Sequence, residues 1–239
     1  MKVKEIARTA NIAWSPASHH PIYLAAGTAA QQLDATFSTS AALEIFALDL
    51  TSDDREMPVK GMLSSEHRFH KLVWGTYGME TEETPSGILV GGTDSGSVVL
   101  WNPVKILNGE TDDAVLIQND KHTGAVQALD LNPFQPNLLA SGASDSEIYV
   151  WDLNSPDNPL TPGAKSLPPD NISCLSWNRQ VQHILASTSP CGRCVVWDLR
   201  KNEPIIKVSD QGSMFGPVAR TVASQRPRAR HVYVVNRVN

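Results

Sequence analysis

The sequence predicts an all-β fold, a β-propeller of the WD-repeat type, on two observations. First, the chain four times runs an apolar strand into a tight polar turn and then into a second apolar strand that ends at an aromatic residue. Second, these endings recur at spacings of 55, 50 and 46 residues. A period of about 40–50 residues with a Trp-Asp ending is typical of propellers built from four-stranded blades. The four endings are Phe46, Trp101, Trp151 and Trp197.

The predicted blades follow one another along the chain, and no segment shows a sustained helical period. In each blade both sheet faces are apolar, as expected for a sheet that lies between two neighbours. The strand segments are 11–16, 22–28 and 42–49 in the first blade, 70–75, 88–93 and 97–103 in the second, 125–133, 138–144 and 147–154 in the third, and 171–180, 183–189 and 194–200 in the fourth.

Irregular segments separate these strands. The turn of the first blade is lengthened to residues 29–41, and residues 51–60 and 78–87 are polar, mostly acidic connectors. Residues 154–170 carry five prolines, which lack the N–H that a sheet interior requires. We therefore expect 154–170 to run over the surface.

Four blades use the chain up to residue 210. A seven-bladed ring of this type needs about 280–315 residues, so we expect 1–210 to be part of a larger, seven-bladed propeller rather than a four-bladed ring. On this interpretation the end blades lack neighbours, and we expect self-association through Ile205, Ile206 and Val208 on an outer strand. The stretch 232–235 is too short to replace three blades.

The charge changes abruptly near residue 210. Residues 1–210 hold all 25 acidic residues, whereas 211–239 hold five arginines, no lysine and no acid. We expect 211–239 to be a basic, solvated and weakly ordered tail of different origin. It lacks the interleaved aromatics of a nucleic-acid site. We also expect no secretory signal at residues 1–10, because no apolar stretch follows their lysines. No apolar run reaches about 18 residues, and the three cysteines fit a reducing compartment, the cytosol.

One set of polar residues in the third blade has the composition of a catalytic triad. His122, Ser141 and Asp145 could form a hydrolase site, but nothing in the sequence supplies an oxyanion hole. In WD-type blades these positions join the strand-ending Trp, here Trp151, in a buried hydrogen-bond relay. Such a relay avoids the cost of burying unpaired polar groups, about 1–3 kcal/mol each. We therefore predict a structural relay, no enzyme activity and no cofactor.

Two other motifs have alternative interpretations. Cys191 and Cys194 form a CxxC, which suits a redox pair or half of a zinc site, but Cys174 and His183 do not have the spacing of a second ligand pair. Aligned on the closing Trp, the two cysteines occupy a turn and a core position, so we predict structural cysteines and no metal. Residues 197–200 resemble the WDxR ending of substrate receptors of cullin-type ubiquitin ligases, which leaves that function as the alternative.

A more specific resemblance covers roughly residues 1–210. The segments 13–39, 67–75, 119–154, 171–187 and 195–210 are similar to the N-terminal propeller of the large outer-cage subunit of the COPII coat. The resemblance implies a seven-bladed, non-enzymatic scaffold at cage vertices that serves ER-to-Golgi transport. It also implies a cytoplasmic protein, peripheral at ER exit sites and COPII vesicles. The implied partners are the smaller outer-coat propeller subunit and other copies of the subunit itself. The resemblance stops at Asp210, which suggests a truncated form with an unrelated tail.

Overall fold

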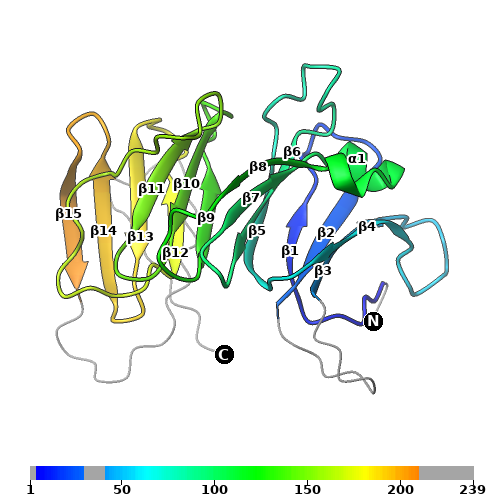
Figure 1. Cartoon of the computed structure of the whole chain (residues 1–239), viewed down its shortest axis with the longest axis horizontal. Helices are drawn as coiled ribbons and strands as arrows, with labels where there is room; N and C mark the ends of the chain where they lie inside the picture. Colours follow the sequence, from blue (N-terminus) through cyan, green and yellow to red (C-terminus); the bar gives the residue numbers. More distant parts are fainter. Residues whose placement is uncertain (1–3, 30–40, 210–239) are drawn as a thin grey trace. The chain divides into compact units, whose positions relative to one another are not determined.

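The computed structural model describes residues 4–29 and 41–209 (Figure 1). The chain divides between Asp120 and Lys121 into two compact units, and each unit contains two antiparallel sheets. The tail 211–239, the stretch 232–235 and most of the lengthened turn 29–41 lie outside the described residues. The predicted boundary near residue 210 therefore stays a prediction.

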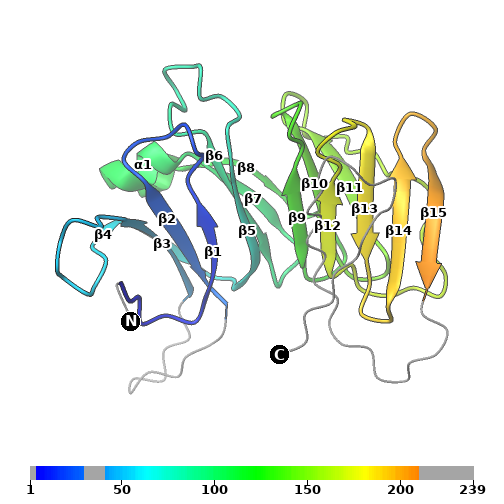
Figure 2. The ribbon, with the colours of Figure 1, turned by 180° about the vertical axis from the view of Figure 1, so that it is seen from behind.

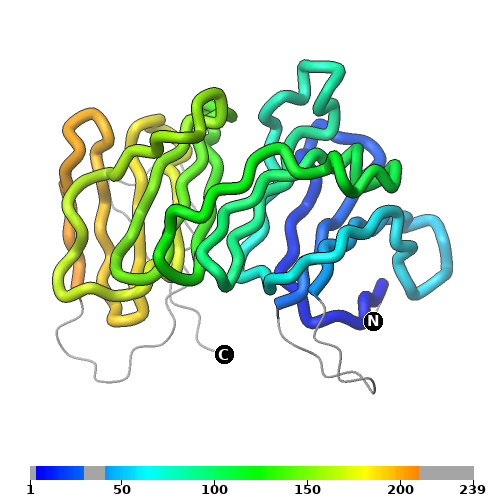
Figure 3. Tube along the Cα trace, viewed as in Figure 1, coloured from blue at the N-terminus to red at the C-terminus, as the bar shows by residue number. Residues whose placement is uncertain are grey.

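The first unit contains two four-stranded sheets whose strands follow chain order. The first sheet comprises β1 (Ala10–Trp14), β2 (Tyr23–Thr28), β3 (Ala41–Ala47) and β4 (Val59–Ser65). The second comprises β5 (Phe69–Gly75), β6 (Ile88–Thr93), β7 (Val98–Trp101) and β8 (Val115–Asn119). The acidic segment 78–87 is the β5–β6 connection, which rises above its sheet (Figure 3).

The second unit contains one three-stranded and one four-stranded sheet (Figure 2). The first has the order β11 (Ile148–Asp152), β10 (Leu138–Gly142) and β9 (Ala128–Leu131). The second comprises β12 (Cys174–Trp177), β13 (Ile184–Thr188), β14 (Arg193–Asp198) and β15 (Glu203–Ser209). Residues 154–170 form no strand, as their prolines predict, and only Leu160 makes an isolated bridge to Val150. Ile205, Ile206 and Val208 lie on the outer strand β15, and their side chains are exposed.

A short helix interrupts the otherwise all-β fold. The helix α1 (Pro103–Asn108) is followed by a 3-10 turn, η1 (Thr111–Asp113). Asn102 accepts a hydrogen bond from the Val104 N–H at the start of α1, and Gly109 ends it in a left-handed conformation, with φ of 78°. Six residues are too few to show a helical period, so these local caps, rather than patterning, specify the helix.

The four aromatic endings share one packing arrangement. Each lies in the third strand of its sheet and stands directly opposite a leucine of the second strand. All eight side chains are buried. The pairs are Leu24–Phe46, Leu89–Trp101, Leu139–Trp151 and Leu185–Trp197. Cross-strand pairs of this kind stabilise a sheet and fix its register.

The residue two positions after each leucine decides how the aromatic ring is accommodated. In the second blade it is Gly91, where an added Cβ would lie 2.8 Å from the Trp101 ring. There Trp101 instead packs edge-on against Phe69, with ring centroids 5.7 Å apart. In the third and fourth blades it is a serine, Ser141 or Ser187, whose hydroxyl accepts the indole N–H.

Two of these pairs, Leu89–Trp101 and Leu185–Trp197, belong to cores that join the two sheets of each unit, whereas Leu24 and Phe46 lie in a smaller cluster with Ala26 and Met57. In the first unit one core combines Leu43 and Ile45 of β3 with Phe69, Leu89 and Trp101 of the second sheet. In the second unit the core combines Ile148 and Val150 of β11 with Trp177, Leu185 and Trp197. The sheets thus stack face to face as propeller blades do, and the predicted fold class is confirmed. No helix among the described residues is long and apolar enough to cross a membrane.

The cross-strand pairs predict a large effect of truncating one leucine. Leu89→Ala leaves a cavity beneath Trp101, so we expect the free energy of unfolding to fall by about 2–5 kcal/mol. Leu116→Ala, in the outer strand β8, is the control and should change it by less than about 1 kcal/mol, since Leu116 is exposed. Urea denaturation measures both, and equal losses would contradict the assigned core.

Candidate functional site

The residues singled out in the third blade form a continuous chain of hydrogen bonds. The Trp151 Nε1–H donates to Ser141 Oγ at 2.7 Å, and Ser141 Oγ lies 2.7 Å from His122 Nε2. His122 Nδ1 lies 3.2 Å from Glu147 Oε2. The carboxylate accepts only, which assigns the imidazole proton to Nδ1 and makes Nε2 the acceptor of the serine proton. Every donor in the chain therefore has an acceptor.

Three structural elements hold this relay. His122 lies in the connection before β9, Ser141 lies in β10, and Trp151 lies in the adjacent strand β11. The rings of His122 and Tyr149 are in contact, with centroids 4.7 Å apart and planes tilted by 52°. The three relay side chains are buried, and Ser141 has no exposed surface. A nucleophile must contact its substrate, so this geometry favours a structural relay over a hydrolase triad.

The acidic member of the relay is Glu147, and the expectation that placed Asp145 there is corrected. Asp145 and Ser146 both have φ of 55°, so they form the left-handed tip of the β10–β11 turn. Glu147 immediately precedes β11, and its carboxylate also accepts the backbone N–H and the hydroxyl of Thr123. The strand period could have identified Glu147, because residues 147, 149 and 151 share one face of the sheet.

Burial and hydrogen bonding shift the pKa values of the relay in a consistent way. Burial lowers the pKa of His122, although Glu147 opposes this shift, so the neutral imidazole is favoured. Burial alone would raise the pKa of Glu147, but the Thr123 backbone N–H, Lys165 and His122 outweigh it and lower that pKa. The relay therefore combines a neutral histidine with an ionised glutamate.

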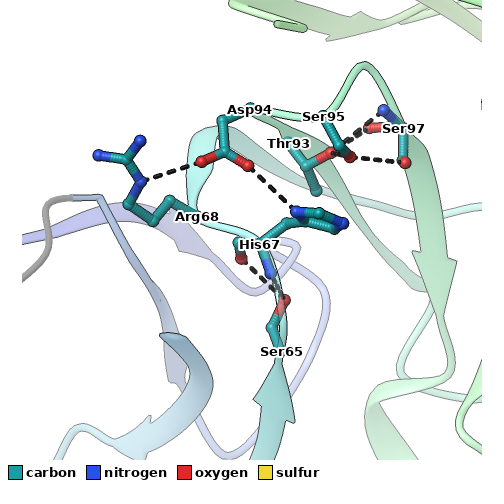
Figure 4. Close-up of polar contacts among 7 residues, drawn as sticks. All are labelled: Ser65, His67, Arg68, Thr93, Asp94, Ser95 and Ser97. Carbon is teal, nitrogen blue, oxygen red and sulfur yellow. Dashed lines mark hydrogen bonds and ion pairs between the residues drawn. The ribbon is translucent and has the colours of Figure 1, made fainter. Parts of the chain in front are cut away.

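A second polar cluster lies in the first unit, at the turn between β6 and β7 (Figure 4). Asp94 Oδ2 accepts from Arg68 Nε at 2.9 Å, and Asp94 Oδ1 lies 3.4 Å from His67 Nδ1. Ser65, the last residue of β4, accepts the His67 backbone N–H. The cluster therefore ties the β4–β5 connection to the next blade's turn, where Ser95 Oγ lies 2.9 Å from the hydroxyls of both Thr93 and Ser97. These polar contacts therefore help to connect the first blade to the second.

The cysteines are placed as structural residues would be. Cys174 pairs with Thr188, and Thr188 pairs with Cys194, so the two cysteines lie two strands apart on one face. That separation, about 9–10 Å, exceeds the reach of a disulfide. Burial raises the pKa of the Cys194 thiol, and Cys191 is exposed in the preceding turn. Within residues 4–29 and 41–209, no group of three or more His, Cys, Asp or Glu side chains could hold a metal ion.

The arginine of the WDxR ending is engaged within its own turn. Arg200 donates to Asp198 through Nε at 3.1 Å and through NH2 at 2.8 Å. These bonds lower the pKa of Asp198 to about 2. The guanidinium therefore stabilises the turn after β14, and both its Nε and its NH2 donate to Asp198.

Comparisons with known proteins find similarity to WD-repeat proteins and to protein transport proteins. The family model described as "WD domain, G-beta repeat" matches residues 114–152. Human Sec31A, a protein transport protein, is 61% identical over 213 residues, which are 89% of this chain and 17% of that protein. Mouse Sec31B is 57% identical over 214 residues, and SEC31 of Dictyostelium discoideum is 42% identical over 220 residues.

A solved structure gives the same result. The structure titled "COPII on membranes, outer coat vertex" matches with a TM-score of 0.68 and 29% sequence identity, over 86% of this chain and 51% of that one. The fold and the buried relay thus define a WD-repeat propeller segment. In particular, the match to Sec31 proteins over 89% of the chain confirms the resemblance to the propeller of the large COPII outer-coat subunit. The chain spans less than a fifth of the length of the Sec31 relatives it matches.

The relay predicts different effects for the two neighbouring acids. Glu147→Gln removes the charged acceptor of His122, Thr123 and Lys165, so we expect the free energy of unfolding to fall by about 1.5–3 kcal/mol. Asp145→Asn, the matched control in the same turn, should change it by less than about 0.5 kcal/mol. Thermal and urea unfolding measure both variants. A larger loss for Asp145→Asn would restore Asp145 to the relay.

Proposed function

We propose that this chain acts as a scaffold segment of the COPII outer coat and that it works through protein–protein contacts. The observation that carries the proposal is the 61% identity to Sec31A, which extends over all four blades rather than a single motif. The match to an outer-coat vertex structure supports it further. Nothing in the comparisons favours the ubiquitin-ligase alternative.

We propose a non-enzymatic role for the chain itself. Its Ser-His-Glu constellation is buried, and Ser141, the nucleophile that a hydrolase would need, has no exposed surface. The named relatives are transport proteins, and the matched structures are coats assembled on membranes. Both support a function in assembly rather than in chemistry.

The finer features of the proposal follow from the family. We place the chain on the cytoplasmic side of COPII vesicles and at ER exit sites, bound peripherally. Its proposed partners are the smaller outer-coat propeller subunit and copies of the large subunit at cage vertices. The tail 211–239 is proposed as a basic extension outside these contacts.

Affinity capture from cytosol tests the proposal. The purified chain, immobilised on beads, should retain Sec31 and its smaller propeller partner, detected by immunoblot against both. The matched control bait carries Trp151→Ala, which removes the packing of the third blade and should lose this binding. Capture of a cullin adaptor without coat proteins, or equal capture by both baits, would contradict the proposal.

A further inference from the structure

The third blade is the one described sheet that lacks an outer strand, because residues 154–170 (the strap) cover the edge of β11 instead. Val150 and Leu160 exchange two backbone hydrogen bonds, of 2.7 and 2.8 Å. Pro159 and Pro162, which have no N–H, flank this contact. The strap therefore supplies backbone hydrogen bonds to one residue of β11, Val150. Its prolines prevent further hydrogen bonds along the edge, which a regular strand would make.

Contacts along its whole length hold the strap, among them the hydrogen bond from Arg193 to the Pro168 carbonyl, at 3.0 Å. Its first half is held by Leu160, and its end is held by Asp170, whose carbonyl accepts the Ser146 N–H at 2.6 Å. Between them, Lys165 Nζ donates to Glu147 Oε1 at 3.2 Å. Leu160 and Leu167 are 68% and 81% exposed, so apolar burial at these two leucines adds little. Pro162 is buried, so the middle of the strap has an apolar contact as well as the ion pair that Lys165 makes with Glu147.

The ion pair joins an accessible group to a buried one. The side chain of Lys165 is 55% exposed, whereas that of Glu147 is 4% exposed. Beside the pair lies a cavity of about 30 Å³, room for one water molecule, bordered by Ile148, Thr161 and Trp197. A reagent can therefore reach the ammonium group while the carboxylate remains within the blade.

We propose that Lys165 is an acylation site whose charge keeps the strap closed over the edge of β11. A thioester donor would supply the acyl group. After Nζ loses its proton, its lone pair attacks the thioester carbonyl, the new N–C bond forms, and the C–S bond breaks to release a thiol. The resulting amide carries no charge and cannot pair with Glu147.

The expected change is local, because Glu147 keeps its other partners. Thr123 and His122 still donate to its carboxylate, so the relay to Trp151 persists. The strap loses its central ion pair, and the two backbone hydrogen bonds between Val150 and Leu160 then open more often. Acylation thus loosens the strap at the edge of β11 while the blade itself stays folded.

Hydrogen exchange of the whole chain tests the proposal. Acetyl-lysine incorporated at position 165, or Lys165→Gln, should accelerate exchange at Val150 and Leu160 and through the strap by about tenfold. Lys165→Arg keeps the charge and should exchange like the unmodified chain. Lys201→Gln is the matched control, because Lys201 is also exposed and its partner Glu203 lies on the surface.

Each alternative result overturns the proposal. Unchanged exchange in the acetylated chain would show that the ion pair does not hold the strap. Equal acceleration in β13 and β14 would show that Lys165 supports the whole unit rather than the strap. Failure of an acetyl thioester to label Lys165 in the folded chain, under conditions that label Lys201, would exclude it as an acylation site.

Discussion

The structure depends on one packing constraint, which is the burial of a large aromatic side chain opposite a leucine in every blade. A sheet that lies between two others must be apolar on both faces, and its side-chain register must be fixed. The Leu–aromatic pair does both, because a slip of one residue would turn the aromatic ring to the wrong face. The recurrence of this pair is what makes the repeat readable in the sequence.

Tryptophan adds a second constraint, since its indole N–H must find an acceptor when the ring is buried. The blades provide for this indole N–H in different ways. The third blade uses the full relay to Glu147, and the fourth uses only Ser187, at 2.9 Å from Trp197 Nε1. The first blade avoids the requirement with Phe46. The polar residues that resemble a catalytic site are therefore a consequence of burying tryptophan.

The aromatic endings, the strand segments and the exclusion of the proline-rich strap from the sheets follow from local sequence, and the structure has all of them. Three of the four relay members were also predictable, because the WD-type pattern specifies His122, Ser141 and Trp151. Asp145 was wrong because the pattern does not reveal backbone conformation: its left-handed φ places it at the tip of the turn. The Asp94 cluster could not be predicted, because His67 and Arg68 precede β5 whereas Asp94 follows β6, and only the folded sheet brings them together. The contact between Lys165 and Glu147 could not be predicted for the same reason, since it depends on the path of the strap.

The central claim is that Trp151 is a structural residue on which the third blade depends, and truncating it is the most direct test. The account predicts that Trp151→Ala lowers the free energy of unfolding by about 3–5 kcal/mol, as for other large buried aromatic residues. Differential scanning calorimetry and urea denaturation of the purified chain measure this change. An unfolding midpoint equal to that of the unmodified chain would contradict the account, because the ring and its relay would then contribute nothing to the fold.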